Sequence, residues 1–393
     1  MRRQRLSFCR RGFDQEGEKV TAKIKKELSL LAVIIKNNVV FFVALTAALL
    51  TMFIIPPDEK YIGYFDFKTL ACLFCTLAVV NALKSIGFFG YIAGKIIIRA
   101  GNLRIATLLL VYITFIGSMF IANDMALLTF LPLGYFVLDS SGKKKYMAYV
   151  FILQTIAANL GGMLTPFGNP QNLYLYSKFN IPDGEFISIM ALPFAVSIAL
   201  VTVCCLFFPG EHIAVTDSGK ALPRGKTAFY LALFALTVVM VFRLIPYYII
   251  LPVVFVAVLF SDRKSLLKVD WFLLMTFAAF FVFSGNMARI PAVSAFFSAL
   301  LEKNTLLTSV LSCQVISNVP SAVLLSQFTG NYRDLLIGVN IGGTGTLIAS
   351  LASLITFRMY VAHNKGGGGK YVLLYSAFSF AFLLILTVVS SIF

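Results

Sequence analysis

The sequence predicts an all-α integral membrane protein built from two similar halves. The chain is 59% hydrophobic and 13% charged, with a mean hydropathy of +0.88, whereas soluble domains carry roughly 25% charged residues. Its apolar runs are about 16–20 residues long, enough for a helix to cross a hydrocarbon core of about 30 Å. One polar motif occurs twice within these runs, at Asn159–Thr165 and at Asn340–Thr346. Duplicated, interrupted apolar segments are typical of secondary transporters.

The positive charge follows membrane topology and does not indicate nucleic-acid binding. The net charge is +16, and residues 1–37 form a predicted basic cytoplasmic tail of the kind that anionic lipid attracts. With this tail inside, most Lys and Arg residues, including Lys143-Lys144-Lys145, fall in inner loops. We therefore expect a multi-pass protein of a bacterial-type inner (plasma) membrane, with the amino terminus cytoplasmic and the carboxyl terminus outside.

The apolar segments divide into continuous crossings, interrupted crossings and re-entrant hairpins. Interrupted crossings are predicted at 147–180 and 335–362. Segments 103–138 and 304–328 each carry a polar break at their centre. We predict both as re-entrant hairpins, since polar backbone at membrane depth must be buried in protein or line a cavity. Continuous crossings are predicted at 38–55, 67–83, 187–208, 226–243, 245–260, 270–285 and 371–392.

The order of these segments predicts two repeats of inverted topology. The first repeat, 38–208, has an even number of crossings and returns the chain to the cytoplasm. A cytoplasmic loop and connecting helix at 209–244 then reverse the starting side of the second repeat, 245–393. The first hairpin therefore opens inward and the second opens outward.

The interrupted crossings carry the groups best suited to bind ions. Thr165-Pro-Phe-Gly-Asn-Pro-Gln-Asn172 cannot continue a regular helix, so the break leaves carbonyls and amides without helical partners. Carbonyl, Asn and Thr oxygens suit Na⁺, and amides at a half-helix amino terminus attract anions. The alternative is a kinked packing helix with glycines at close helix contacts. The second break rests on Gly342, Gly343 and Gly345 and offers Thr344, Thr346, Ser350 and Ser353.

The hairpin tips add two further candidates. Asp124, beside Asn123, is the only carboxylate predicted deep in the membrane, and such a residue is a functional candidate because burying an unpaired charge is costly. Its functional role is to carry a coupling proton or to ligate Na⁺, and the alternative is that it caps the second hairpin helix as its N-cap; the two roles are compatible. The other tip contains Ser317, Asn318 and Ser321, which either bind substrate oxygens or form a simple turn. No arginine falls within either predicted site.

Catalysis has little support in the sequence. His212 and His363, the two histidines, fall in predicted loops. No intramembrane acid pair, metal-ligand cluster or phosphate-binding loop is recognisable, so no enzyme activity and no cofactor is expected, apart from Na⁺ or H⁺ as a coupling ion.

At these motifs the chain resembles the ion transporter superfamily, which includes citrate permeases, divalent-anion/sodium symporters and arsenite pumps. Ala122-Asn-Asp124 is similar to the first tip of the arsenite-pump and citrate-permease branches, and Thr165–Asn172 is similar to a citrate-permease loop. Ser317–Ser321 with Gly342–Ser353 looks closest to small, poorly characterised bacterial inner-membrane anion permeases. The resemblance implies a homodimer with a scaffold domain and a mobile transport domain that moves as an elevator. It places cation or proton coupling on Asn123, Thr165, Gly168, Asn169, Asn318, Thr344 and Thr346, to which the sequence adds Asp124.

The predicted function is secondary active transport of a small anionic solute, with di- and tricarboxylates among the candidates, coupled to H⁺ or Na⁺. The alternative is an efflux permease for arsenite or a similar oxyacid, or a Na⁺/H⁺ antiporter. Dicarboxylate symporters of the superfamily carry Ser-Asn-Thr at both tips, whereas this chain has Ala-Asn-Asp and Ser-Asn-Val, which favours proton coupling. The predicted substrate-binding residues are Asn123, Asn169, Asn172, Ser317, Asn318, Ser321, Ser350 and Ser353.

Overall fold

The computed structural model describes residues 34–35, 38–213 and 221–392. The predicted tail 1–37, apart from residues 34–35, lies outside the described residues, as do residues 214–220 of the predicted loop. The described chain is helical, with an isolated β-bridge between Asn102 and His212. The first half contains α2 (Val39–Ile54), η1 (Glu59–Tyr64), α3 (Phe67–Ser85), α4 (Phe88–Ile97), α5 (Leu103–Ser118), α6 (Asn123–Ser140), η2 (Lys144–Tyr146), α7 (Met147–Gly161), η3 (Gly162–Leu164), α8 (Pro170–Lys178) and α9 (Asp183–Leu206).

The rest of the chain repeats much of this order. α10 (Arg224–Val241) lies in the predicted connecting segment, and α11 (Tyr247–Ser261) and α12 (Arg263–Leu267) begin the predicted second repeat. They are followed by α13 (Trp271–Ala288), α14 (Pro291–Lys303), α15 (Thr305–Ile316), α16 (Asn318–Leu325), α17 (Tyr332–Ile341), α18 (Leu351–His363) and α19 (Gly368–Ile392). The series α3 to α9 thus has the same sequence of long helix, short helix, hairpin, broken helix and long helix as the series α13 to α19.

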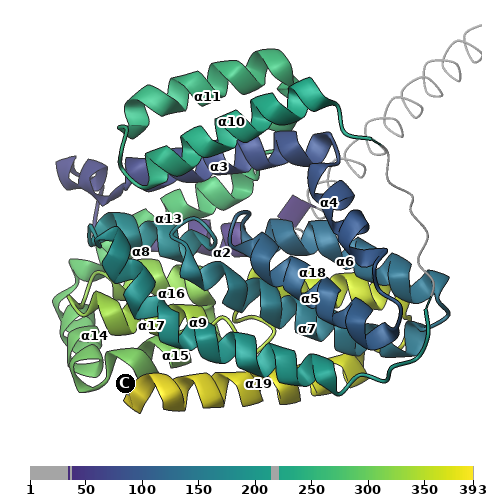
Figure 1. Cartoon of the computed structure of the whole chain (residues 1–393). Coiled ribbons are helices and arrows are strands. Elements are labelled where there is room, and N and C mark those ends of the chain that lie inside the picture. Colours follow the sequence, from purple (N-terminus) through teal and green to yellow (C-terminus); the bar gives the residue numbers. More distant parts are fainter. Residues whose placement is uncertain (1–33, 36–37, 214–220, 393) are drawn as a thin grey trace, which may run out of the picture.

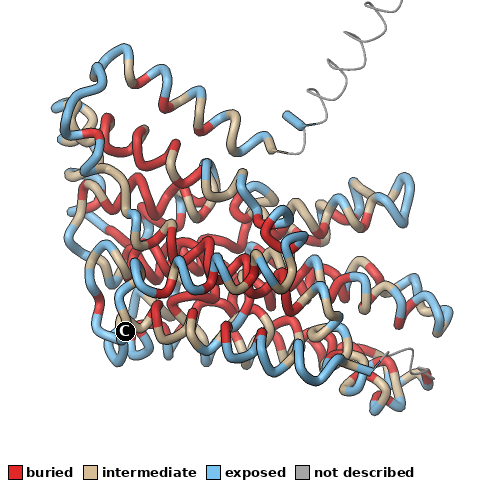
Figure 2. Tube along the Cα trace, turned by 90° about the horizontal axis from the view of Figure 1, so that it is seen from above, coloured by how far each residue is buried: buried red, intermediate tan, exposed pale blue. Residues whose placement is uncertain are grey.

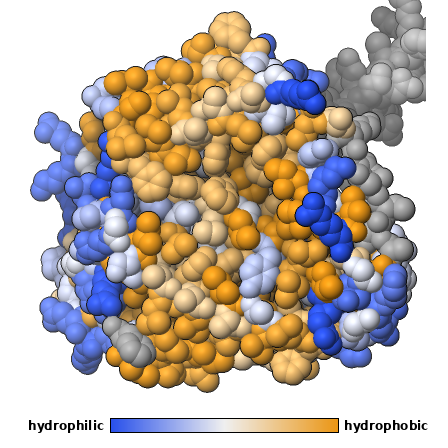
Figure 3. Space-filling model, viewed as in Figure 1, coloured by the Kyte–Doolittle hydropathy of each residue, from blue (hydrophilic) through white to orange (hydrophobic). Residues whose placement is uncertain are grey.

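The surface confirms the expectation of a membrane protein. Six of the described helices, counting η2, α7 and η3 as one, are long and apolar enough to cross a membrane. In the space-filling view a broad apolar belt lies between two polar edges (Figure 3). The helices run across this belt (Figure 1).

Burial separates inner helices from outer ones. In the apolar stretch of each helix, 78% of the residues are buried in α3 and 83% in the α7 segment. The share is 28% in α10 and in α19. The tube view shows buried chain at the centre and exposed chain around it (Figure 2). The outer helices therefore present apolar faces to lipid, and the broken helix α7–α8 lies near the centre of the molecule.

The two halves interlock. α2 packs against α13, while α3 packs against α10 and α11. The second helix of each hairpin contacts the second half of the other broken helix, since α6 packs on α18 and α16 packs on α8. The short helices α4 and α14 lie at opposite edges of the molecule (Figure 1).

Local caps explain where the hairpins begin. The side chain of Asn102 accepts a hydrogen bond from Ile105 N at 2.9 Å, and that of Asn304 accepts one from Leu307 N at 2.8 Å. Asparagine is a favoured N-cap because its side-chain oxygen satisfies a free amide of the first turn. The first helix of each hairpin therefore begins with an asparagine N-cap.

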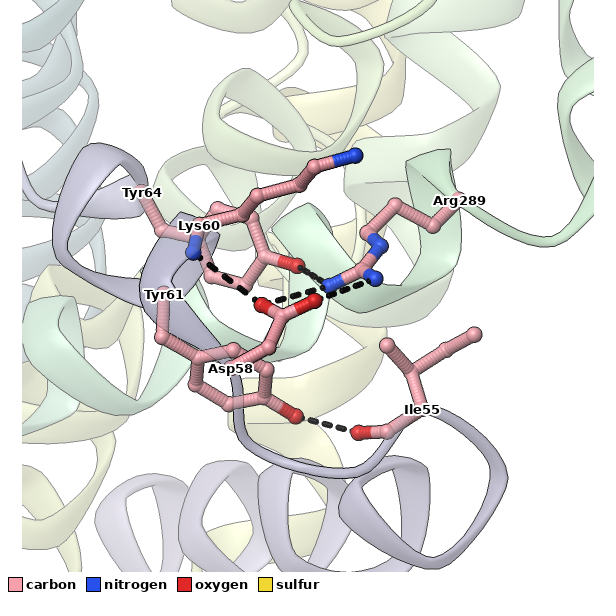
Figure 4. A network of polar contacts seen from close by, with 6 residues as sticks. All are labelled: Ile55, Asp58, Lys60, Tyr61, Tyr64 and Arg289. Carbon is pink, nitrogen blue, oxygen red and sulfur yellow. Dashed lines mark hydrogen bonds and ion pairs between the residues drawn. The ribbon is translucent and has the colours of Figure 1, made fainter.

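A polar network fixes the loop after α2 to the end of α13 (Figure 4). Arg289 donates two hydrogen bonds to the carboxylate of Asp58, at 3.0 and 2.7 Å, and a third to the hydroxyl of Tyr64 at 3.0 Å. The Arg289 guanidinium lowers the pKa of Asp58. The Tyr64 ring lies over Gly285, where a Cβ would come within 2.5 Å of the ring. A glycine is thus required at this contact between η1 and α13.

Candidate functional site

The first broken helix is held open by Asn172. Its buried side chain donates to three carbonyls of the break, Gly162 O at 3.2 Å, Met163 O at 3.1 Å and Thr165 O at 3.2 Å. Pro170 then occupies the first turn of α8, where its missing N–H has no cost. The carbonyls that the break frees are therefore capped within the first repeat.

In the second broken helix, a residue of the neighbouring hairpin caps the free carbonyls. Gln314, near the end of α15, donates to Gly342 O at 2.9 Å and Thr344 O at 3.1 Å, and it accepts from Thr346 N at 2.8 Å. Gly345 has φ +111°, a conformation that favours glycine. A Cβ there would meet the Gln314 side chain at 2.1 Å, so close approach adds to the backbone requirement.

The ends of the two broken helices contact each other reciprocally. Ser350, the N-cap of α18, donates to Asn159 Oδ1 of α7 at 2.8 Å. In the same way Asn169, the N-cap of α8, donates to Asn340 Oδ1 of α17 at 3.1 Å. Ser350 and Asn169 stand at equal offsets from Asn340 and Asn159 in their motifs. Each break is therefore closed by a residue of the other half.

A second pair of equivalent hydrogen bonds connects each break to the hairpin of its own half. Thr165 donates to the carbonyl of Met119 at 2.6 Å, and Thr346 donates to the carbonyl of Gln314 at 3.2 Å. Met119 and Gln314 each precede the tip asparagine, Asn123 or Asn318, by four residues. The duplicated motif thus produces duplicated hydrogen bonds, which a kinked packing helix alone does not explain.

The first tip does not use Asp124 as a cap. α6 begins at Asn123 with Ala122 as its N-cap, and no side chain caps it. The N-cap alternative for Asp124 is therefore wrong: Asp124 lies one position inside the helix. Asn123 Nδ2 donates to Asn159 Oδ1 at 2.9 Å, and Asn123 Oδ1 accepts from Asp124 N at 3.0 Å. Asp124 Oδ1 is buried without a hydrogen-bond partner among the described atoms.

The second tip is uncharged and has a constrained backbone. Ser317 has φ +75°, which is unfavourable for a residue with a Cβ. Asn318 N donates to Ala349 O at 3.0 Å, and Ser317 Oγ donates to the same carbonyl at 3.2 Å. Ser321 Oγ donates to Ser317 O at 2.7 Å. The tip is thus bound to the segment that precedes α18 and is more than a free turn.

A cavity of about 480 Å³ lies where these parts meet. Its polar floor contains residues from both tips and from the starts of α8 and α18. Residues of α2 and α13 form the apolar wall of the cavity, together with apolar residues of the second tip. The polar floor is formed by Asn123, Asp124, Gln171, Ser317, Asn318 and Ser350.

The sequence missed several residues of this cavity. Gln171, Asp270, Thr276 and Arg358 line it, and none was among the predicted site residues. The expectation that no arginine falls near the site is wrong, because α18 brings Arg358 to the cavity about two turns beyond Ser350. Asp270 is a second carboxylate there, at the N-cap of α13. Only the packing of α13 and α18 around the tips reveals either residue.

The predicted site residues separate into two groups. Asn123, Asp124, Ser317, Asn318 and Ser350 line the cavity. The others form an interior group that does not line it and that lies at the breaks, at the second tip or, for Ser353, against α19. Ser353 is buried and bonds to the Tyr375 hydroxyl at 2.7 Å. This interior group comprises Thr165, Gly168, Asn169, Asn172, Ser321, Thr344, Thr346 and Ser353.

Three side-chain oxygens at the first tip and at the start of α8 lack a hydrogen-bond donor among the described residues. Asp124 Oδ1, Asn169 Oδ1 and Gln171 Oε1 are buried and accept no hydrogen bond from the described residues. The break carbonyls, in contrast, already accept N–H groups from Asn172 and Gln314. In the described part of the chain no three His, Cys, Asp or Glu side chains form a group that could hold a metal ion.

The comparisons with known proteins decide the class. A family model described as citrate transporter matches residues 30–331. This chain belongs to the citrate transporter family. It is a multi-pass membrane transporter and not an enzyme.

Several known proteins are similar to this chain. An uncharacterised transporter of Methanocaldococcus jannaschii is 32% identical over 353 residues, covering 90% of this chain and 97% of the relative. The inner membrane protein YbiR of Escherichia coli is 29% identical over 316 residues, covering 79% and 84%. A silicon efflux transporter of Oryza sativa is 28% identical over 194 residues, 46% of this chain and 39% of that protein. The structure of the YdaH transporter of Alcanivorax borkumensis matches with a TM-score of 0.49 and 13% identity, over 85% of this chain and 87% of that one.

Proposed function

We propose that this member of the citrate transporter family is a secondary active transporter for a small anionic solute, coupled to H⁺ or Na⁺. The observation that carries the proposal is the cavity floor. There the two hairpin tips and the starts of two half-helices converge, and an unpartnered Asp124 carboxyl oxygen lies among amide and hydroxyl groups. Half-helix amino termini attract an anion. Asp124 and Gln171, which both line the cavity, supply oxygen ligands for Na⁺, and Asp124 is the alternative site for H⁺.

The transport mechanism that we propose is alternating access of the elevator type. The repeats are inverted in this proposal, which is supported by the reciprocal contacts of Ser350 and Asn169 and by the opposite edges taken by α4 and α14. The hairpins, broken helices, α9 and α19 form the moving unit. α2, α3, α10, α11 and α13 form the scaffold of a homodimer, with the basic edge around Lys143 cytoplasmic and the carboxyl terminus outside.

The test is uptake into proteoliposomes that contain the purified full chain. Labelled succinate, citrate and smaller carboxylates and sulfonates are offered with a sodium gradient, a proton gradient or neither. Accumulation of one anion under one gradient is expected, and Asp124→Asn should abolish the dependence on that gradient. Its matched control is Asp139→Asn, the same substitution near the other end of α6, because Asp139 is exposed and does not line the cavity. Gradient-driven uptake that survives in Asp124→Asn removes the proposed coupling role.

Efflux of a neutral oxyacid is the second candidate, and one observation favours it: the similarity to a silicon efflux transporter. A proton-coupled exporter also needs a carboxyl such as Asp124. Everted vesicles supplied with external arsenite or silicic acid distinguish the two functions, since an exporter accumulates the oxyacid inside them under a proton gradient while anion uptake is absent.

A further inference from the structure

The cavity has a wall whose chemistry the proposed function does not use. α2 contributes Val39, Val43, Ala44 and Ala47, and α13 contributes Phe280 and Phe283. A small and highly charged solute gains nothing from such a surface, because burying apolar area stabilises only an apolar partner.

The charges around the cavity limit the charge of the substrate. Among the described lining residues, Arg358 is the cation, and Asp124 and Asp270 are the acids. Asp270 accepts from Leu273 N at 2.9 Å and caps α13. Arg358 is also engaged in an interaction of its own. A tricarboxylate would leave much of its charge without a partner, and a desolvated charge is costly unless it is paired.

The floor suits one anionic group. Asn318 of the second tip and the N-terminal turn of α18 line the cavity and offer amide groups, whereas the hydroxyls of Ser317 and Ser350 already donate within the protein. Asp124 lines the same cavity, so protonation or Na⁺ binding there removes the repulsion that an incoming anion meets. A cavity of about 480 Å³ is of the size that takes a small organic molecule, roughly 300–1,000 Å³ in known sites.

From these observations we propose that the substrate is an amphiphilic monoanion, an organic acid with one carboxylate or sulfonate and a hydrocarbon or aromatic body. The charged group binds at the floor beside Ser317 and Asn318, and the body lies against the α2–α13 wall. This inference rests on the proposed function, which it narrows from small anions in general to this class.

Binding is measured on the purified full chain through the fluorescence of Trp271. This residue is the single tryptophan of the chain and lies between Asp270 and Phe272, which both line the cavity. The probes are straight-chain carboxylates and sulfonates of increasing length, with succinate, citrate and alkylamines as comparators. Affinity should rise about two- to fourfold with each methylene until the wall is covered, and citrate and the amines should bind at least tenfold more weakly than the best acid.

A filling variant separates the wall from general partitioning into detergent. Ala47→Phe should lower affinity for the longest acids at least tenfold and leave the shortest acids unchanged. The matched control is Leu50→Phe on the same helix, because Leu50 is 60% exposed and does not line the cavity. Should Ala47→Phe fail to fold, Val43→Phe fills the same wall.

Three results would overturn the inference and leave the proposed function intact. The first is affinity that does not change with chain length while succinate or citrate binds most tightly. The second is equal loss of long-chain binding in Ala47→Phe and Leu50→Phe. The third is binding of alkylamines as tight as that of the acids, which would indicate a lipid as the occupant. Failure of the proposed function is a different result: no anion of any length is accumulated in the gradient assay.

Discussion

The two broken helices perform the same task with different residues. In the first, Asn172 of the helix itself caps three carbonyls. In the second, Gln314 of the neighbouring hairpin caps two carbonyls and accepts one amide. The equivalent of Asn172 is Ser353, whose hydroxyl instead bonds to Tyr375. The first break is therefore stabilised from within, whereas the second depends on its hairpin.

The tips differ in a complementary way. The first tip carries Asp124 and is bonded through Asn123 to α7. The second tip carries Val319 at the equivalent place, has a strained backbone at Ser317 and bonds to the carbonyl of Ala349. The charged tip thus belongs to the repeat whose break is internally capped. The second repeat joins its tip and break into one unit, and we expect them to move or loosen together.

The largest expected effect is on the first break. Asn172→Ala leaves three buried carbonyls without their donor and should lower the free energy of unfolding by about 3 kcal/mol, since each unsatisfied buried group costs roughly 1–3 kcal/mol. The matched control is Ser353→Ala, which removes one hydroxyl contact and should cost about 1 kcal/mol. Thermal unfolding of both variants in detergent measures the difference. Equal losses would show that the two breaks are stabilised alike.

The next effect tests whether the second break depends on its hairpin. Gln314→Met gives the second hairpin the residue that stands at the equivalent place in the first, and it removes the cap on Gly342 and Thr344. Hydrogen exchange of residues 343–349 should become faster, while residues 162–169 keep their protection, because the cost of the lost bonds falls locally. Met119→Gln is the reverse exchange and should change neither segment. Faster exchange in both segments after Gln314→Met would contradict the assignment.

The amino-acid sequence locates the breaks but not the groups that stabilise them. Proline and glycine interrupt a helix wherever it packs, so Pro170 and Gly345 mark the two breaks by residue type alone. Gln314 carries no such signal, because its role depends on the packing of α15 against α17. Asp270 and Arg358 are likewise separated from the motifs in sequence, and only tertiary packing brings them to the cavity. The N-cap alternative for Asp124 fails because the backbone of a single residue sets the start of a helix, and composition does not determine that residue.

A smaller effect tests the equivalence of the two repeats. Thr165→Val and Thr346→Val each remove one hydroxyl bond to a hairpin carbonyl, at Met119 or Gln314, and should each cost about 1 kcal/mol. The double variant should cost the sum, because the two sites share no partner. Unfolding temperatures of the single and double variants measure this. A clear excess in the double variant would mean that the breaks are coupled through the centre of the protein.

The smallest expected effect compares the two polar edges. At one edge Glu211 pairs with Lys143 and accepts a hydrogen bond from the Tyr146 hydroxyl at 2.8 Å. These two partners, Lys143 first, lower the pKa of Glu211 from 4.5 to about 2. At the other edge, Arg289 lowers the pKa of Asp58 (Figure 4). Because the folded-state pKa is depressed, each pair stabilises fully above the unfolded pKa and loses that contribution as pH falls toward the folded value.

Glu211→Gln and Asp58→Asn should therefore each lower the unfolding temperature slightly, by the same amount at every pH from 8 to about 5.5, well above the unfolded pKa values. The gap from the unchanged protein should then shrink as pH falls through about 4.5 and vanish near the folded pKa of Glu211. Both edges are exposed, so screening keeps the effects small, and added salt should reduce them further. A gap that instead widens in acid would show that the carboxylates are destabilising in the folded chain and that hydrogen bonds from Tyr146 or Tyr64 hold these loops without them.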